Sequence, residues 1–488
     1  MKRKFITNLI LVVFLNLLVK PFWIFGIDRT VQNVVGSDQY GFYFSLLSFS
    51  LLLNILLDIG ITNFNNRAIA REPDLISEYF SNIIVLKFLL AIFYAVVCLT
   101  VGLVIGYTSV QFKMLGLLVI NQFLASFLLY LRSNISGLQY FRTDSIISVL
   151  DRTIVIIICG VLLWGNITEQ QFRIEWFVYA QTAAYLITVI VAFLIVLSKT
   201  EFLRPRFDMK YFILILKKSY PFALLILLMS FYNRIDSVML ERLLPDGKTE
   251  AGIYAQSFRI LDAASMFAFL FAGLLLPIFS RMIKQADPLN DITGLSFKLI
   301  IIPAIILACL ATFYSQYIIN WMYNEHVYYS SRIFPLLMFG FVSISITYIF
   351  GTLLTANGNL RELNILAGSA LIMNIILNLI LMPRYQAYGA AVSSLITQTF
   401  MAITQIFVAV KKFRFHPDWG LIIRLSSYTG VIFIFAWFSR TYIQNWFAGA
   451  LILTGISVLC AFVIRLLNIK DLYRIVRFGD EMNPESGT

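Results

Sequence analysis

The sequence is poor in charge and in the residues that build metal or disulfide sites. Asp, Glu, Lys and Arg make up 13% of its 488 residues, about half the share usual in soluble proteins. The four cysteines are isolated in apolar runs and there are only two histidines, so we expect no disulfide framework, metal site or histidine-based catalytic site. No G-x-x-x-x-G-K-[ST] loop occurs, which argues against direct use of ATP. We therefore expect neither a cofactor nor a metal.

Apolar residues dominate instead. They make up 59% of the chain, including 44 Phe and 24 Tyr, and the mean hydropathy is +0.82. Soluble proteins are about 45–50% apolar. So few polar side chains cannot coat several soluble domains, whereas a surface that faces lipid needs no such coat. The composition predicts an all-α polytopic membrane protein with aromatic residues at its interfaces.

About fourteen apolar runs are long enough to cross a bilayer, which takes about 20 mostly apolar residues per helix. The first run follows several positive charges, but it is too long for a signal peptide and lacks a small-residue cleavage site, so we expect a retained helix. The predicted spans are 5–27, 40–62, 82–107, 112–131, 145–164, 176–198, 219–243, 252–280, 295–317, 333–354, 364–383, 387–410, 423–440 and 446–465.

Positive charge is distributed unevenly between the loops. With the N-terminus inside, 25 of the 38 Lys and Arg residues fall in cytoplasmic segments and about seven fall outside. This asymmetry places both termini in the cytoplasm. It also accounts for the net charge of +12, which therefore gives no reason to expect nucleic acid as a partner. No loop is long enough for a soluble domain; the longest, 199–218, is basic and predicts an interfacial helix that links two halves.

A short sequence recurs six spans apart. Gln39–Tyr43 (QYGFY) opens the second span and Glu250–Tyr254 (EAGIY) opens the eighth, each after a short outer loop. Copies six spans apart have the same orientation, which predicts two parallel six-helix lobes around a central cavity and transport by alternating access. The expected domains are 1–208 for the first lobe, 209–412 for the second, and 413–488 for the last two spans and a cytoplasmic tail.

Ionisable residues inside spans gather in the first helix of the first lobe and the first two helices of the second. They are Lys20, Arg234, Asp236, Arg259 and Asp262. Each costs about 2.5–3.5 kcal/mol on insertion, and such residues usually face an interior cavity. The cations outnumber the acids, and arginine holds phosphate oxygens in bidentate fashion. We therefore predict a cationic cavity, formed by Lys20, Arg234 and Arg259, that attracts an anion.

Helical spacing indicates which of these groups meet. Arg259 and Asp262 are three residues apart and share a helix face, so they can pair, whereas Arg234 and Asp236 diverge by about 200°. Asp58, Asp236 and Asp262 are candidates for cavity acids or for ion coupling. A purely structural role, in ion pairs that fix packing, stays open for all five ionisable residues in those three helices.

Uncharged polar residues add candidates for the cavity wall. Asn54 shares a predicted helix face with Asp58, nearer the cytoplasm. Asn374 and Asn378, one turn apart, either line the cavity or hold helices together. The full set of polar candidates is Asn54, Asn233, Asn374 and Asn378.

Three further charges lie near the cytoplasmic ends of their spans. Lys87, Asp151 and Arg152 are five to eight residues from those ends. Long side chains in such positions reach the interface. We therefore expect these residues to snorkel and to stay outside the site.

Several motifs, in their order and spacing, resemble those of bacterial polysaccharide and O-antigen flippases of the Wzx type, which belong to the MOP exporter superfamily. The resemblance runs over nearly the whole chain and rests on order, spacing and span count more than on any one motif. The motifs are VGSDQYGFY at 35–43, DIGI at 58–61, RIDSVML at 234–240, AGIY at 251–254, TANGN at 355–359 and YGAA at 388–391.

The resemblance implies a twelve-helix core in two lobes, with two appended helices at about 423–465 that offer a groove for a polyprenyl tail. It implies flipping of undecaprenyl-diphosphate-linked oligosaccharide between leaflets of the bacterial inner (plasma) membrane, for O-antigen, capsule or exopolysaccharide synthesis. The implied partners are this lipid-linked glycan, membrane lipids and the polysaccharide polymerase machinery. The positions that match the family's cationic cavity are Lys20, Arg234 and Arg259.

Three other functions fit parts of the sequence. A cation-coupled exporter of small molecules, similar to MATE transporters, would use Asp58, Asp236 and Asp262 to bind cations or protons. A flippase for lipid II, similar to MurJ, would use the same cationic cavity. A membrane glycosyltransferase or polymerase generally needs large outer loops with catalytic residues, and the outer loops here are short. We therefore expect a transporter and not an enzyme.

Overall fold

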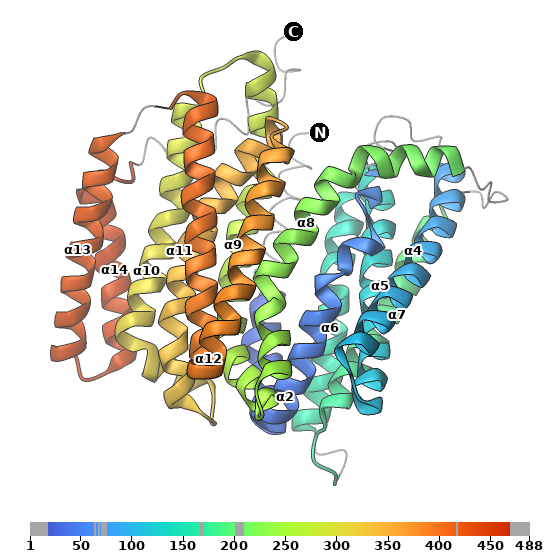
Figure 1. Ribbon diagram of the computed structural model, residues 1–488, viewed down its shortest axis with the longest axis horizontal. Helices are drawn as coiled ribbons and strands as arrows, with labels where there is room; N and C mark the ends of the chain where they lie inside the picture. The colour runs from blue at the N-terminus through green and yellow to red at the C-terminus, as the bar shows by residue number, and fades with distance from the viewer. Residues whose placement is uncertain are drawn as a thin grey trace. The chain divides into compact units, whose positions relative to one another are not determined.

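The computed structural model describes residues 18–62, 65, 66, 69, 76–165, 169–200, 209–415 and 418–468. Every regular element in these residues is a helix (Figure 1), which confirms the predicted all-α fold. The elements are η1 (Phe22–Asp28), α2 (Arg29–Leu52), η2 (Asn54–Leu57), α4 (Ile76–Ile105), α5 (Ser109–Gly137), α6 (Phe141–Trp164), α7 (Ile174–Leu197), α8 (Met209–Leu243), α9 (Gly247–Gln285), α10 (Asn290–Met322), α11 (Val327–Ala356), α12 (Leu360–Phe413), α13 (Trp419–Tyr442) and α14 (Trp446–Val463).

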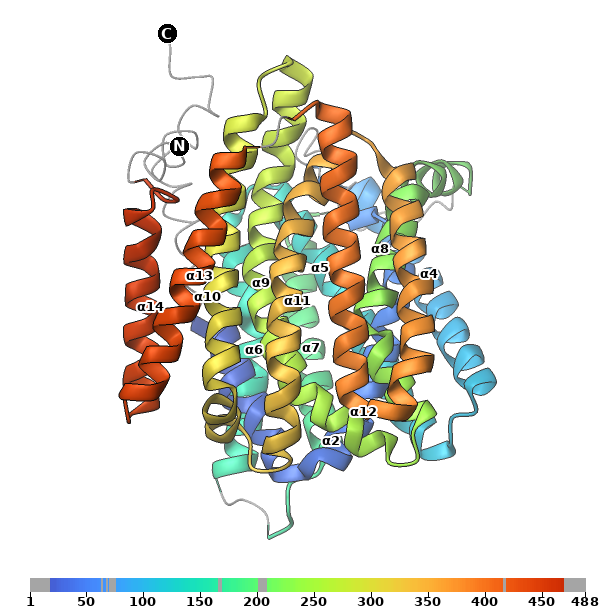
Figure 2. The ribbon, with the colours of Figure 1, turned by 60° about the vertical axis from the view of Figure 1, so that its left-hand side comes forward.

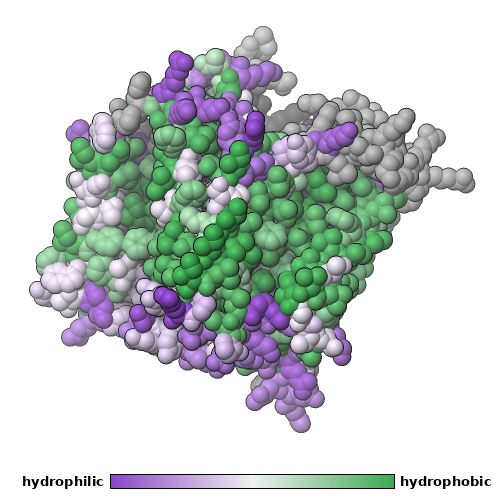
Figure 3. Space-filling view, viewed as in Figure 1, coloured by the Kyte–Doolittle hydropathy of each residue, from purple (hydrophilic) through white to green (hydrophobic). Residues whose placement is uncertain are grey.

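Eleven of the described helices are long and apolar enough to cross a membrane. One of them, α12, covers two predicted spans and breaks between them at Gln386, where φ is 53°. Hydrophobic residues cover the middle of the helices in Figure 3, and hydrophilic residues gather at their lower ends, as suits helices in a bilayer. Most of the first predicted span lies outside the described residues, as do His416 and the tail from 469, so the count of fourteen stays a prediction.

The chain divides into two compact units. The first contains the residues up to Ala255 together with Asn378–Ala387, and the second contains Gln256–Leu377 and the residues from Tyr388. In the first unit α7 packs against α5 and α6, and α8 packs against α2. In the second unit α10 packs against α11, α13 and α14, and α13 and α14 lie side by side (Figure 2). The expected lobe boundaries after residues 208 and 412 stay predictions.

The predicted linker at 199–218 lies partly outside the described residues, but it is helical from Met209. Figure 1 shows that the start of α8 runs across the ends of the neighbouring helices and that the rest runs along them. The stretch apolar enough to cross a membrane begins at Ser219, next to Pro221 inside the helix. Proline inside a helix removes one backbone hydrogen bond and kinks the helix. Pro221 therefore accounts for the change of direction between the start of α8 and its membrane-crossing part.

α2 and the start of α9 cross at the two glycines of the recurring sequence. A Cβ atom added to Gly41 would lie 1.9 Å from the carbonyl oxygen of Lys248, and one added to Gly252 would lie 2.0 Å from the carbonyl oxygen of Ser37. The approach follows a kink in α2 at Gly36, whose φ of 80° favours glycine. The recurrence therefore has a packing cause, because only glycine lets these two backbones touch.

Replacing Gly252 with alanine is expected to lower the thermal unfolding midpoint, because the new methyl group must push α2 away from α9. Overpacking of this kind costs about 1–3 kcal/mol. The matched control is Gly116→Ala on α5, where an added Cβ meets nothing within 4 Å, so alanine should be neutral or stabilising. Equal midpoints for Gly252→Ala and the unmodified protein would show that the two helices do not meet there.

Candidate substrate site

The second predicted span is not one continuous helix. α2 ends early, the 3₁₀ turn η2 follows, and Ile59 (φ 45°) and Gly60 (φ 85°) then adopt left-handed backbone conformations. The prediction that Asn54 and Asp58 share a helix face is therefore wrong. The side-chain amide of Asn54 instead donates a hydrogen bond of 2.9 Å to Gln122 Oε1 on α5.

Lys87 of α4 fills the space beside this break. Its Nζ lies 2.5 Å from Asp58 Oδ1 and also donates to the carbonyl of Leu57 at 3.1 Å and to the hydroxyl of Ser126 at 3.3 Å. The hydroxyl of Thr62 donates to the same carboxylate. The side chain of Lys87 is 1% exposed, so the expectation that it snorkels to the interface is wrong. The ion pair of Lys87 with Asp58 links the segment after η2 to α4. A role for Asp58 in ion coupling stays a prediction.

Arg152 on α6 is held by aromatic rings. Its Cζ lies 5.2 Å from the ring centroid of Trp23 and 5.7 Å from that of Tyr185, and its Nη2 donates to the Tyr185 hydroxyl at 3.0 Å. Phe177 stacks on Trp23 with centroids 5.4 Å apart. The Arg152 side chain remains 29% exposed and lies 3.5 Å from the carboxylate of Asp151. Cation–π contacts thus fix the guanidinium between two aromatic rings.

Lys20, the first predicted cation, lies one turn before Trp23. It is half-buried, and Arg152, Arg132 and Asp151 act on it electrostatically. Trp23 belongs to η1, a π-helix, and such segments are rare and frequent at functional sites. The structure therefore gives Lys20 a cationic neighbour, Arg152, that the sequence analysis assigned to the interface.

We call Lys20, Arg152, Trp23 and Tyr185 the cation–aromatic group. Two cations share one adjacent carboxylate, Asp151, so the group carries net positive charge. The surrounding side chains are mostly apolar, which strengthens electrostatic attraction relative to water. A guanidinium held flat can offer two parallel donors to a phosphate. The group is therefore suited to hold an anion, and a phosphate in particular.

Asp236 of α8 is fully buried and accepts two hydrogen bonds. The side-chain amide of Asn378 donates at 2.7 Å and the hydroxyl of Tyr254 donates at 3.1 Å. The structure thus brings together two predicted residues and gives Asn378 a part in holding α12 to α8. Arg234 and Asn233 precede Asp236 on the same helix and are half-buried. Their predicted place in a cavity wall stays a prediction.

A similar acid near the start of the chain was not predicted. Asp28, the last residue of η1, is 2% exposed and accepts a hydrogen bond of 2.8 Å from the Tyr40 hydroxyl on α2. Asp28 and Asp236 therefore share one arrangement, a buried carboxylate held by a tyrosine of the following helix. The recurring segments did not signal this arrangement, since Tyr40 comes before the shared glycine of its copy and Tyr254 comes two residues after the shared glycine of the other.

In the second unit, the predicted pair on α9 forms. Arg259 Nη1 lies 3.7 Å from Asp262 Oδ2, and the two side chains are 16% and 18% exposed. The prediction that spacing of three residues lets them pair is confirmed. Asn374 is fully buried and donates to the Thr397 hydroxyl at 3.4 Å, which joins the two halves of α12.

The described residues contain no group of three or more His, Cys, Asp and Glu side chains that could hold a metal ion. The four cysteines are free, and three of them are buried.

Comparison with known proteins gives the fold and the family. The model of a family described as polysaccharide biosynthesis protein matches residues 9–283. Lipid II flippase MurJ in an inward closed conformation is similar with a TM-score of 0.66 and 18% identity, over 95% of this chain and 100% of that one. An inward-facing multidrug resistance MATE family transporter of the MOP superfamily has a TM-score of 0.62 and 12% identity, over 80% and 94%. The MATE transporter VcmN of Vibrio cholerae has a TM-score of 0.56 and 14% identity, over 83% and 98%. No curated protein matches the chain.

The chain has the fold of the solved MurJ flippase and MATE transporters, and eleven of its described helices are long and apolar enough to cross a membrane. The family match covers more than half of the sequence, and the chain belongs to the polysaccharide biosynthesis protein family. The predicted link to polysaccharide biosynthesis and the predicted MOP flippase fold are therefore confirmed.

Proposed function

We propose that the protein flips an undecaprenyl-diphosphate-linked oligosaccharide from the cytoplasmic to the outer leaflet of the bacterial inner membrane. The oligosaccharide would be a repeat unit of a cell-surface polysaccharide, and both termini would lie in the cytoplasm. The family match to polysaccharide biosynthesis supports this substrate class over lipid II. The polymerase machinery that uses the flipped repeat unit would be its functional partner.

The observation that carries the proposal is the cation–aromatic group. Lys20 and Arg152 are cations inside helices that are otherwise apolar, and Trp23 and Tyr185 fix the guanidinium in place. Such charges are costly in a membrane unless they serve a ligand or an ion pair. A diphosphate headgroup supplies the anion, and Arg234 and Arg259 are the further cations proposed to contact it along the path.

Flipping of this kind needs no hydrolysis. An inside-negative membrane potential favours outward movement of a negative headgroup by about 2.3 kcal/mol per charge per 100 mV. In alternating access the cations would bind the headgroup on the inside and release it on the outside. The backbones of α2 and α9 are in contact at Gly41 and Gly252. We expect these two helices to separate there when the protein opens to the outside.

A second candidate is cation-coupled export of a small molecule, and one specific observation favours it. Asp28 and Asp236 are buried carboxylates that each accept a hydrogen bond from a tyrosine hydroxyl, and Asp236 also accepts one from the amide of Asn378. Such an acid can bind a proton or a metal cation. In the flippase these acids would couple counterflow of a cation to lipid movement, so they are compatible with either function.

Thermal stabilisation by undecaprenyl diphosphate tests the substrate class. A ligand that binds only the folded protein stabilises it by about 2.7 kcal/mol at one hundred times its Kd. We expect stabilisation of the unmodified protein, and a loss of most of it in Arg259→Ala, measured as the shift between midpoints with and without lipid. The matched control is Arg361→Ala, at an exposed position, which should keep the full shift. Stabilisation by a lipophilic cation, with none by the polyprenyl diphosphate, would favour the exporter instead.

A further inference from the structure

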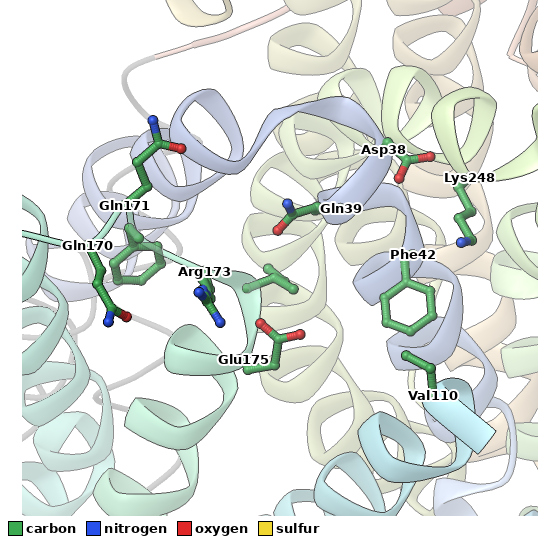
Figure 4. Close-up of a pocket in the computed structure, with 11 residues that line it drawn as sticks. Asp38, Gln39, Phe42, Val110, Gln170, Gln171, Arg173, Glu175 and Lys248 are labelled. Carbon is green, nitrogen blue, oxygen red and sulfur yellow. The ribbon is translucent and has the colours of Figure 1, made fainter. Parts of the chain in front are cut away.

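A hollow of about 570 Å³ opens within the first unit, where four segments meet (Figure 4). α2 contributes Asp38, Gln39 and Phe42, and the start of α9 contributes Lys248. The start of α5 contributes Val110, and the segment from 170 into α7 contributes the remaining polar groups. The volume falls in the range of pockets that hold small organic ligands, about 300–1,000 Å³. All four segments lie at the helix ends that the charge distribution assigns to the outside.

The polar side chains around this hollow have few partners of their own. Among the described residues, the side chains of Asp38, Gln39, Arg173 and Glu175 make no hydrogen bond or ion pair with one another or with other groups. Lys248 rests on the face of the Phe42 ring, with Nζ 5.3 Å from its centroid, which leaves the ammonium donors available. Figure 4 shows Gln39, Arg173 and Glu175 directed toward the same space. These five side chains therefore leave donors and acceptors open to the hollow.

The numbers of acidic and basic side chains around the hollow indicate which class of ligand it suits. Two carboxylates, Asp38 and Glu175, face two cations, Arg173 and Lys248, so the hollow has no net attraction for a phosphate or for a simple cation. Carboxylates, amides and cations together suit a ligand whose hydroxyl groups both donate and accept hydrogen bonds. Hydrogen bonds to charged groups are about twice as strong as neutral ones. Phe42 adds an apolar surface for the C–H faces of a sugar ring.

We propose that this hollow, which we call the outer pocket, binds the saccharide portion of the transported lipid. The inference rests on the proposed function and extends it, because the cation–aromatic group would hold the diphosphate whereas the outer pocket would hold sugars after they reach the outside. Headgroup binding and sugar binding then belong to different residues. Substitutions can therefore separate them.

The test uses two probes on the full-length protein in nanodiscs. One is the oligosaccharide released by mild acid from the undecaprenyl-linked intermediates of the native cells, and the other is undecaprenyl diphosphate without sugar. We expect the Asp38→Asn/Glu175→Gln variant to bind the released oligosaccharide roughly tenfold or more weakly, and to bind undecaprenyl diphosphate unchanged. The matched control is Asp246→Asn/Glu169→Gln, which alters two exposed acids of the neighbouring loops that do not line the pocket. Equal thermal midpoints of both variants would show that folding is intact.

The outcomes distinguish the two proposals. Oligosaccharide binding that is equal in the pocket variant and the control, or absent in the unmodified protein, would overturn the outer pocket as a saccharide site and leave the flippase proposal standing. Failure of undecaprenyl diphosphate to bind the unmodified protein would overturn the proposed function. Binding of the free oligosaccharide that weakens in the pocket variant and not in the control shows that the pocket recognises the sugar itself.

Discussion

Replacing Lys87 with methionine is expected to lower the free energy of unfolding by about 3–5 kcal/mol, because it leaves the carboxylate of Asp58 without its cation in the interior. Nζ of Lys87 lies 2.5 Å from that carboxylate, and the lysine side chain is 1% exposed. The break after η2 depends on the same side chain, since Nζ also donates a hydrogen bond of 3.1 Å to the carbonyl of Leu57. The measurement is the unfolding transition of the purified protein in detergent.

The double variant Lys87→Met/Asp58→Leu separates the loss of the pair from the loss of packing. Removing both charges should recover most of the stability, because an apolar pair of similar volume often replaces a buried ion pair at little cost. Lys113→Met is the matched control, since Lys113 lies exposed on α5 and surface changes usually stay within about 0.5 kcal/mol. A Lys87→Met protein as stable as this control would mean that the ion pair does not hold the broken segment.

Replacing Arg152 with alanine is expected to reduce transport by about tenfold or more while the protein still folds. The guanidinium is the cation most firmly positioned by the rings of Trp23 and Tyr185, and a charge-assisted contact to phosphate contributes about 1.5–3 kcal/mol. Arg152→Lys should retain part of the activity, because it keeps the charge but loses the bidentate geometry and the stacking. The measurement is surface polysaccharide production in cells that lack the chromosomal copy.

The control for Arg152 is Arg142→Ala, at an exposed position near the start of the same helix. It removes one positive charge from α6 without touching the aromatic rings, so production should stay near the unmodified level. Full production by Arg152→Ala, at equal protein abundance, would contradict a part for the cation–aromatic group in substrate binding.

The helical framework could be predicted from the sequence because lipid imposes a simple rule. Apolar runs of about 20 residues must become helices, and the described helices from α4 onward follow the predicted spans. Even the turn in α12 was anticipated, with predicted spans that end and begin on either side of Gln386. The pairing of Arg259 with Asp262 was predictable for a similar reason, since it depends only on helical spacing.

The contacts that shape the site could not be predicted in this way, because they join residues far apart in the sequence. Asp58 meets Lys87 only where the second span breaks, and the apolar pattern of that span gives no sign of the break beyond Gly60. Arg152 is held by the rings of Trp23 and Tyr185, which belong to two other helices. Nothing in the sequence around Trp23 indicated that its ring would contact Arg152. Distance from a span end misplaced Lys87, since its partners inside the protein outweighed access to the interface. The expected place of Arg152 at the interface stays a prediction.

The most direct test of the proposed function is movement of lipid across a membrane. The purified protein would be reconstituted into liposomes that carry undecaprenyl-diphosphate-linked oligosaccharide from the native cells, and the fraction of glycan reachable by an external glycosidase would be followed over time. We predict that the unmodified protein makes glycan from the inner leaflet accessible and that Arg152→Ala does so much more slowly. Access no faster than in protein-free liposomes, from protein whose unfolding transition shows it to be folded, would contradict a lipid-linked oligosaccharide flippase.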